Sequence, residues 1–348
     1  MTTQGADVVV LEARSRIGGR VLTHRTAAGC YDLGPAWIWP TLQPRVARLV
    51  ETAGLDVYEQ AAAGGFIFQD RQGRVQRLDN GFPQEPPSMR IRGGVEALLT
   101  AAAGPRGSDA IRLRSPVRRI LVHDHGVEVG ADGPDGPFTL RSRRAALALP
   151  PRLLRGIDLQ PPLPAALWQR LDATPTWMAG HAKALAIYDQ PHWREAQLSG
   201  GAMSQCGPLA EIHDASLPGA PEAALFGFFG WDAGRREMAG ATLTEQVVAQ
   251  LRRLYGPAAG APRKLVIQDW AMEPLTSTAA DRLAGGAHPD YHPILLPETW
   301  NDRLTLSGSE MAPEFAGYLE GALAAAETAA AWAHGDGVGP NQCVESAK

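Results

Sequence analysis

Continuous and alternating runs of hydrophobic residues divide the chain into short predicted elements. Residues 7–12 (DVVVLE) form an apolar run that ends in a carboxylate, which is typical of a buried parallel strand. Residues 65–78 predict a hairpin whose turn is 70–73, and residues 182–188 predict a second buried strand. Further strands are expected at residues 117–122, 127–130, 145–149, 224–229, 265–269 and 304–307.

Helical spacing of apolar residues marks fewer segments. It is clear over residues 42–53, where Gly54 is suited to end the helix. Other helices are expected at residues 93–103, 243–254 and 316–333. Residues 83–89 are rich in proline and predict irregular chain, and the polar tail over residues 335–348 is expected to fray.

Composition indicates a globular enzyme of two domains. The chain has 348 residues, of which 45% are hydrophobic and 20% charged, and its formal net charge is −4 with scattered arginines. These features argue against binding to nucleic acid or to a membrane surface. The first residues lack a signal-peptide pattern, so a cytoplasmic location is expected. The three cysteines, Cys30, Cys206 and Cys343, are far apart and predict neither disulfides nor a metal site.

The first strand ends in a motif that suits a dinucleotide. A carboxylate such as Glu12, at the end of the second strand of a dinucleotide-binding unit, accepts hydrogen bonds from ribose hydroxyls. A glutamate that simply ends a surface strand is the alternative. The adjacent Gly18 and Gly19 favour the binding reading, because they let the backbone approach a phosphate that Arg20 can neutralise.

The whole string Glu-Ala-Arg-x-Arg-x-Gly-Gly-Arg resembles the second-strand signature of the flavin-containing amine oxidases, which include monoamine and polyamine oxidases. Similar segments follow in the family's order at residues 31–38, 92–98, 115–120, 146–151, 161–164, 178–183, 269–274, 306–310 and 317–323. The resemblance implies an α/β fold in which a doubly wound, Rossmann-like FAD-binding domain carries an α+β substrate domain on a mixed sheet. It assigns residues 1–75, 93–155 and 295–334 to the FAD domain, residues 76–92 and 156–294 to the substrate domain, and residues 335–348 to a tail.

The resemblance also implies the residues that hold the adenosine and diphosphate end of FAD. Glu12, Arg14 and Arg20 serve this end together with the Gly18-Gly19 pair, and the backbone of Val117 holds the adenine.

At the flavin end, the resemblance implies contacts mainly from backbone: Gly34, Pro35, Ala36 and Trp37 against the ring, Gly308, Ser309 and Glu310 at the phosphate and ribityl groups, and Gly317 at the pyrimidine edge. Trp270 belongs to the stretch that precedes the substrate cavity. No cysteine lies near Ala279, where covalent members attach the flavin, so FAD is expected to be non-covalent.

Two residues match catalytic positions of the family. Lys183 matches the lysine that holds a water against flavin N5; an ordinary strand lysine is the alternative reading. Tyr318 matches one wall of the aromatic cage, whose other tyrosine is replaced by Ala280. Any of Trp37, Trp39 or Trp177 would be a substitute wall, or part of the core.

The implied reaction is the oxidation of a carbon–nitrogen bond. A neutral small-molecule amine delivers hydride to N5, and O₂ reoxidises the flavin with release of H₂O₂. No metal is expected, and a homodimer is a further expectation.

One departure concerns the cofactor loop. Residues 1–7 resemble the end of the family's first helix, and no Gly-x-Gly-x-x-Gly follows a strand anywhere in the chain. Weak FAD binding is therefore expected. A pseudoenzyme with a truncated N-terminus is one alternative, and another flavoenzyme of the superfamily, such as a desaturase, is a second. Lys183 and residues 317–321 argue against the second, and an NAD-dependent enzyme would leave the flavin-facing motifs unexplained. A shorter stretch over residues 78–92 resembles the compact bacterial type.

Overall fold

The computed structural model describes residues 6–81, 84–104, 110–283, 286–292, 294–297, 300 and 302–335. The chain divides into two compact units: unit 1 comprises residues 1–19, 102–177 and 287–348, and unit 2 comprises residues 20–101 and 178–286. Residues 1–5, Phe82 and Pro83, and the tail beyond Gly335 lie outside the described residues. The division into FAD and substrate domains stays a prediction, because compactness does not reveal which residues bind a cofactor.

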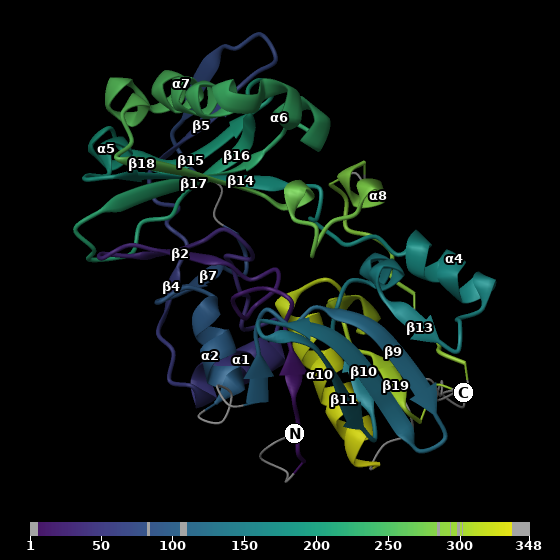
Figure 1. Cartoon of the computed structure of the whole chain (residues 1–348). Helices are drawn as coiled ribbons and strands as arrows, with labels where there is room; N and C mark the ends of the chain where they lie inside the picture. Colours follow the sequence, from purple (N-terminus) through teal and green to yellow (C-terminus); the bar gives the residue numbers. More distant parts are fainter. Residues whose placement is uncertain are drawn as a thin grey trace, which may run out of the picture. The chain divides into compact units, whose positions relative to one another are not determined.

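Unit 1 contains short parallel strand pairs, a larger sheet and a long helix (Figure 1). Its elements are β1 (Val10–Leu11), β8 (Ile111–Arg112), β9 (Val117–His123), β10 (Gly126–Gly133), β11 (Gly136–Ser142), β12 (Ala145–Leu147), η2 (Pro151–Gly156), β13 (Asp158–Gln160), α4 (Ala165–Ala173), β19 (Leu304–Leu306), η6 (Ser309–Met311) and α10 (Leu319–His334). Strand β1 pairs in parallel with β8, and β12 pairs in parallel with β19. The larger sheet has the order β11-β10-β9-β13.

The core of unit 1 joins residues from distant parts of the chain. Ile120 on β9, Leu154 in η2, Leu171 on α4 and Leu304 on β19 are all buried in one cluster with Trp300. Ile120, Leu154, Leu171 and Leu304 lie at least 17 positions apart in the sequence. Burial of apolar surface at about 25 cal/mol per Å² therefore holds the segments of this unit together.

Unit 2 is built on one large sheet. Its elements are β2 (Thr23–Arg25), β3 (Cys30–Asp32), α1 (Pro44–Thr52), β4 (Val57–Glu59), β5 (Gly65–Gln69), β6 (Val75–Leu78), β7 (Met89–Ile91), α2 (Glu96–Ala103, which runs into unit 1), β14 (Ala182–Tyr188), α5 (His192–Glu195), β15 (Leu198–Ser204), β16 (Leu209–Asp214), β17 (Ala223–Phe229), α6 (Ala233–Ala239), η3 (Gly240–Thr242), α7 (Leu243–Tyr255), η4 (Pro257–Gly260), β18 (Lys264–Asp269), η5 (Trp270–Met272) and α8 (Ala279–Arg282). Over the described residues the sheet order is β18-β14-β17-β16-β15-β5-β6. Every pair is antiparallel except β15 with β5, so the sheet is mixed.

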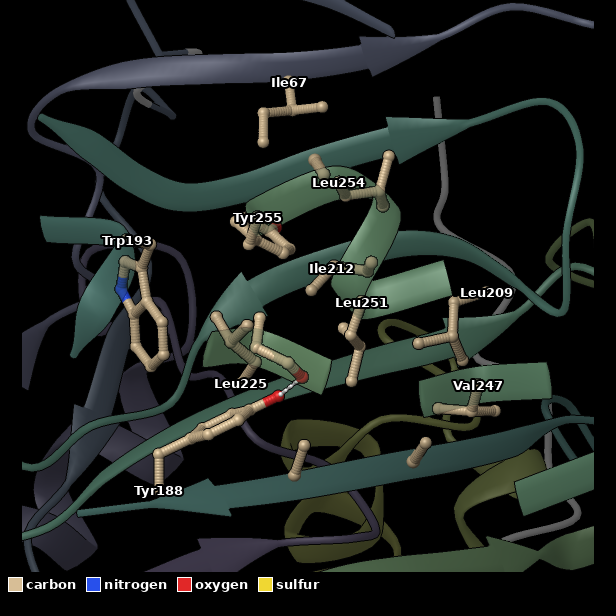
Figure 2. Packing of buried hydrophobic residues seen from close by; sticks show 14 of the residues in the cluster. Ile67, Tyr188, Trp193, Leu209, Ile212, Leu225, Val247, Leu251, Leu254 and Tyr255 are labelled. Carbon is tan, nitrogen blue, oxygen red and sulfur yellow. Dashed lines mark hydrogen bonds between the residues drawn. The ribbon is translucent and has the colours of Figure 1, made fainter. Parts of the chain in front are cut away.

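Strand β14 is buried on both faces, and its alternating side chains enter two different cores. Its alanines and Tyr188 pack with Val247 and Leu251 of α7, as Figure 2 shows. The hydroxyl of Tyr188 donates a hydrogen bond to the carbonyl of Ala259 at 2.9 Å, which pairs its one polar group. Leu185 and Ile187 point to the opposite face and pack with Tyr31. The odd-numbered residues of β14, Lys183 included, therefore share the face opposite α7.

The structure confirms several predicted elements and corrects others. The hairpin of β5 and β6, strands β14 and β17, and helices α1 and α7 occur as expected. The first strand is parallel but not buried, since Val9 and Val10 are 44% and 45% exposed and β1 pairs only with β8 among the described residues. The last helix begins at Leu319 rather than at residue 316, because Gly317 has φ +83°. Several elements were not expected: β2, β3, β4, β7, β8, β11, β13, β15 and β16 among the strands, and α4, α5, α6 and α8 among the helices.

Candidate active site

Lys183 lies in unit 2 on β14, the strand next to the edge strand β18 of the large sheet. Its side chain is 3% exposed, and Nζ donates hydrogen bonds to the carbonyl oxygens of Gly34 at 2.6 Å and Asp32 at 3.3 Å. Nζ also lies 4.7 Å and 4.9 Å from the ring centroids of Phe226 and Phe228. Burial lowers the pKa of Lys183 to about 7, with the nearby Asp32 opposing the shift. Lys183 is thus a buried amine that exchanges its proton near neutral pH.

The three carbonyls of residues 32–34 all accept hydrogen bonds from distant parts of the chain. Lys183 serves the outer two, and the indole Nε1 of Trp270 donates to the carbonyl of Leu33 at 3.0 Å. Gly34 must be glycine here, because a Cβ would lie 2.2 Å from the carbonyl oxygen of Arg20. This network fixes the backbone that leads into Pro35, Ala36 and Trp37. The structure therefore brings Lys183, Trp270 and residues 32–34 together.

The same face of the sheet carries charged groups that the sequence analysis did not single out. Glu211 accepts a hydrogen bond from His213, with Oε1 and Nε2 2.7 Å apart, and this bond together with Lys183 lowers the pKa of Glu211. Arg90 is 2% exposed and its guanidinium lies 5.4 Å from the Phe226 ring centroid. The sequence held one signal for these residues. In residues 209–214 (LAEIHD) polar and apolar residues alternate, which predicts a strand with Glu211 and His213 on the same side.

In unit 1, Glu12 and Arg14 are tied to the chain after β8. The carboxylate of Glu12 accepts a hydrogen bond from the backbone N–H of Arg14 at 2.7 Å. The backbone of Ser115 donates to the carbonyl of Glu12, and that of Arg114 donates to the carbonyl of Arg14. Val117 begins β9 two residues later. These contacts bring three of the predicted adenosine-end residues into one local arrangement.

Gly18 and Gly19 both adopt positive φ, +105° and +55°. A Cβ on Gly19 would meet no atom within 4 Å, so space lies open beside this backbone. The guanidinium of Arg16 donates to the carbonyls of Ile17 and Gly19 and holds the loop closed on itself. Arg20 is the first residue of unit 2. The loop thus has half-buried glycine backbone with open space beside Gly19, which is what a phosphate needs.

A second loop of unit 1 joins η6 to α10. Gly317 donates its backbone N–H to the carbonyl of Ser309 at 3.2 Å, which places the two predicted flavin-binding segments side by side. Glu310 is 1% exposed and accepts a hydrogen bond from the Ser309 hydroxyl. A Cβ on Gly308 would lie 2.9 Å from the carbonyl of Leu149. Only glycine allows this approach.

Tyr318 lies in an aromatic cluster of unit 1. Its ring centroid is 4.5 Å from that of Trp177 and 5.3 Å from that of His288, on which it stacks at 20°. Burial raises the pKa of the Tyr318 phenol, which keeps it protonated. Nε1 of Trp177 is buried without a hydrogen-bond partner among the described residues. His288 is a neighbour that the sequence analysis missed, because nothing in its local pattern distinguishes it.

The predicted site residues are divided between the two units. Unit 1 holds Glu12, Arg14, Gly18, Gly19, Val117, Gly308, Ser309, Glu310, Gly317 and Tyr318, whereas unit 2 holds Arg20, Gly34, Pro35, Ala36, Trp37, Lys183 and Trp270. Three features of unit 1 fit a flavin nucleotide: open glycine backbone at Gly19, the hydrogen-bond-accepting carboxylate of Glu12 after a strand, and the buried Trp177 Nε1, which has no partner among the described residues. The described residues contain no group of three metal-ligating side chains.

Comparison with known proteins identifies the family. A sequence model described as "Flavin containing amine oxidoreductase" matches residues 1–88 and 68–333. The chain belongs to this family. The prediction drawn from the Glu12–Arg20 string and the segments that follow it is therefore confirmed, and so is the α/β fold with its mixed sheet.

Individual members of the family share limited sequence identity with this chain. The chain is 27% identical over 259 residues to an L-amino acid dehydrogenase of Synechocystis sp., covering 71% of this chain and 51% of the relative. It is 27% identical over 263 residues to putrescine oxidase of Kocuria rosea, covering 71% and 53%. Cyclohexylamine oxidase of Brevibacterium oxydans superposes with a TM-score of 0.77 at 21% identity, over 96% of this chain and 95% of that chain. The chain spans about half the length of the curated relatives it matches. No helix in the described part of the chain has the length and apolarity that crossing a membrane requires.

Proposed function

We propose that this protein binds FAD non-covalently and oxidises the carbon–nitrogen bond of a small amine. The observation that carries the proposal is the buried Lys183, held against the carbonyls of Asp32 and Gly34 in a chain of the flavin-containing amine oxidoreductase family. Among the described residues, no carboxylate lies within salt-bridge distance of this amine. Burying an amine without such a partner is costly, which favours a chemical role over a structural one. Bound FAD supplies the electron acceptor for a hydride equivalent, which O₂ removes as H₂O₂.

Lys183 is proposed to hold and move a proton at Nζ. As an ammonium it has three N–H donors, of which two are engaged by backbone carbonyls, and this leaves one position for a water. Because burial lowers its pKa to about 7, the amine is part protonated and part neutral at neutral pH. A group of this kind can take up or release a proton when the amine substrate is oxidised.

Other residues of the chain are proposed to bind and orient the amine substrate and FAD. Tyr318 faces the amine, and its protonated phenol adds a polar tip to an aromatic wall. Glu12 holds ribose hydroxyls, while Arg14 and Arg20 neutralise the diphosphate. The remaining contacts are those predicted by resemblance: Gly18, Gly19 and Val117 at the adenosine end, and Gly34, Pro35, Ala36, Trp37, Trp270, Gly308, Ser309, Glu310 and Gly317 toward the ring. A cytoplasmic location and a homodimer stay predictions.

Anaerobic mixing with a panel of amines tests this function. We expect amines to bleach the flavin absorbance, and air to restore it with release of H₂O₂. Bleaching without peroxide release in air would favour a dehydrogenase that passes its electrons to an acceptor other than O₂. The Synechocystis relative is named as a dehydrogenase. Absence of bleaching with every amine, in a protein that holds stoichiometric flavin, would favour the pseudoenzyme.

Replacing Lys183 gives a sharper test. Lys183→Met removes the titratable amine but keeps an apolar stem of similar length, so flavin reduction or reoxidation should slow by about 10²-fold or more. Lys264→Met, which changes an exposed lysine at the start of β18, is the matched control and should leave both rates unchanged. Equal rates in the Lys183→Met variant and the wild type would remove Lys183 from the mechanism.

A further inference from the structure

Arg90 is a buried cation without a paired acid. It lies on β7 directly opposite Tyr58 of β4, and it is 2% exposed. Among the described residues its one hydrogen bond runs from Nη1 to the carbonyl of Asp214 at 3.5 Å, and its buried Nε has no partner. No carboxylate among the described residues lies within salt-bridge distance of the guanidinium. Because a guanidinium keeps its proton under all ordinary conditions, Arg90 is a permanent positive charge inside unit 2.

Lys183 and Arg90 both lie over the ring of Phe226. Nζ of Lys183 is 4.7 Å from the centroid of this ring, and the guanidinium carbon of Arg90 is 5.4 Å from it. The two cations are therefore at most about 10 Å apart, a separation over which charges interact strongly where water is excluded. Both side chains are buried, so little water screens the repulsion. Arg90 thus makes a protonated Nζ less favourable.

Asp32 supplies the opposing charge. It is buried, and its Oδ1 accepts hydrogen bonds from the Thr23 hydroxyl at 2.6 Å and from the Val95 backbone N–H at 2.9 Å, which suits a carboxylate. Burial raises the pKa of Asp32, and the charge of Arg90 opposes this rise. The backbone carbonyl of Asp32 accepts a hydrogen bond from Nζ of Lys183, so the acid belongs to the segment that holds the amine. Asp32 favours the protonated Nζ that Arg90 disfavours.

Two other titratable groups, Glu211 and His213, face Lys183 from β16. They bind each other, with Oε1 and Nε2 2.7 Å apart, so the imidazole takes up part of the effect of the carboxylate. The Glu211 side chain is 38% exposed, and solvent weakens its action on Nζ. Burial lowers the pKa of Lys183 to about 7; Asp32 and Glu211 oppose this shift, and Arg90 adds to it. The two buried charges, Arg90 and Asp32, are therefore the pair to test.

We propose that Arg90 is a positioning residue of the reaction: acting through Lys183 and against Asp32, its fixed charge decides whether Nζ carries a proton when the amine binds. This inference rests on the proposed function, in which Nζ holds and moves a proton. With Arg90 in place, Nζ exchanges its proton near neutral pH. Without Arg90, Nζ keeps its proton through the neutral range and no longer takes one up.

The chain allows a direct measurement, because it contains only three lysines, Lys183, Lys264 and Lys348. Lysine that is isotope-labelled at Cε gives one NMR signal for each of them, and single Lys→Met variants assign the signals. The change of each signal with pH reports the titration of that amine. In the purified chain with FAD added, we expect the midpoint of Lys183 near pH 7.

Removing the two buried charges should move this midpoint in opposite directions. Arg90→Gln should raise it by about one pH unit, and Asp32→Asn, which keeps the oxygen that Thr23 and Val95 bind, should lower it by about one pH unit. Arg77→Gln, at an exposed arginine of β6, is the control and should leave the midpoint unchanged. A loosened core gives a different pattern, because entering water raises the midpoint in every variant.

Flavin reduction by an amine, followed without oxygen over the same pH range, connects these charges to the reaction. Its pH profile should move up in Arg90→Gln and down in Asp32→Asn. If Arg90→Gln does not fold, Arg90→Met, which keeps an apolar stem beside Phe226, provides the same test. The inference is overturned by a midpoint that stays in place when Arg90 is replaced, or by one that moves the same way in the Arg90 and Asp32 variants.

The inference and the proposed function fail separately. If amines are oxidised while the midpoint of Lys183 ignores Arg90, the proposed function stands and this inference is wrong. In an active chain, a pH profile that does not follow the midpoint would also overturn the inference. If the midpoints move in opposite directions in a chain that oxidises no amine, Arg90 does control the proton of Lys183, and the oxidase function is wrong.

Discussion

At the residue scale, Lys183 links stability to pH. Its pKa is about 7 in the folded chain and near 10.5 for an ordinary lysine. Between these values the unfolded chain binds more protons than the folded chain, so the free energy of unfolding rises as pH increases. From about pH 7 to about pH 9, the wild type should gain roughly 2 kcal/mol relative to Lys183→Met. Urea unfolding at several pH values measures this, with Lys264→Met as control. Parallel pH curves for the wild type and Lys183→Met would contradict it.

A second residue, Gly34, owes its identity to packing rather than to backbone angle. A Cβ at this position would lie 2.2 Å from the carbonyl oxygen of Arg20 and 3.1 Å from the amide nitrogen of Leu22. Gly34→Ala should therefore lower the free energy of unfolding by about 1–3 kcal/mol or more. Gly156→Ala is the matched control, because no atom lies within 4 Å of that Cβ. Equal shifts of the denaturant midpoint in both variants would contradict this prediction. They would show that the backbone at Arg20 moves away from a Cβ at position 34 at little cost.

At the element scale, β14 depends on helix α7 for one of its two cores. Leu251 is 1% exposed in the cluster that also holds Ala184 and Tyr188. Leu251→Ala leaves a cavity in this cluster and should lower the free energy of unfolding by about 2–5 kcal/mol. Thr244→Ala, on an exposed turn of the same helix, should change it by less than about 0.5 kcal/mol. Thermal or urea unfolding that fails to separate the two variants would mean that α7 contributes little to the sheet.

At the scale of the whole molecule, the prediction concerns the cofactor. The 348 residues contain no Gly-x-Gly-x-x-Gly after a strand, and among the described residues β1 pairs only with β8 and exposes Val9 and Val10. Purified as this chain, the protein should hold less than stoichiometric FAD. Absorbance of bound flavin measures this. A yellow, stoichiometric complex of the 348-residue chain would refute the prediction.

The sequence by itself determined the family and the elements with a strong hydrophobic pattern, because these follow from local patterns. The apolar run of β14, the turn at residues 70–73 and the helical spacing of α1 and α7 need no knowledge of distant contacts. The family followed from the resemblance of the string from Glu12 to Arg20 together with the similar segments that come after it in the family's order. The sequence did not predict polar strands such as β11 and β16, because pairing with neighbouring strands, rather than their own composition, makes them strands.

Only the tertiary structure decided which groups meet. The carbonyls of residues 32–34 receive donors from positions 183 and 270, which no local pattern can pair. The position of Glu211 opposite Phe228 depends on strand order and register, and a shift of one residue would turn it to the other face. The lowered pKa of Lys183 likewise arises from burial by side chains far away in the sequence. Chemistry that depends on distance and desolvation is set by the fold, whereas residue identity sets only what each group is able to do.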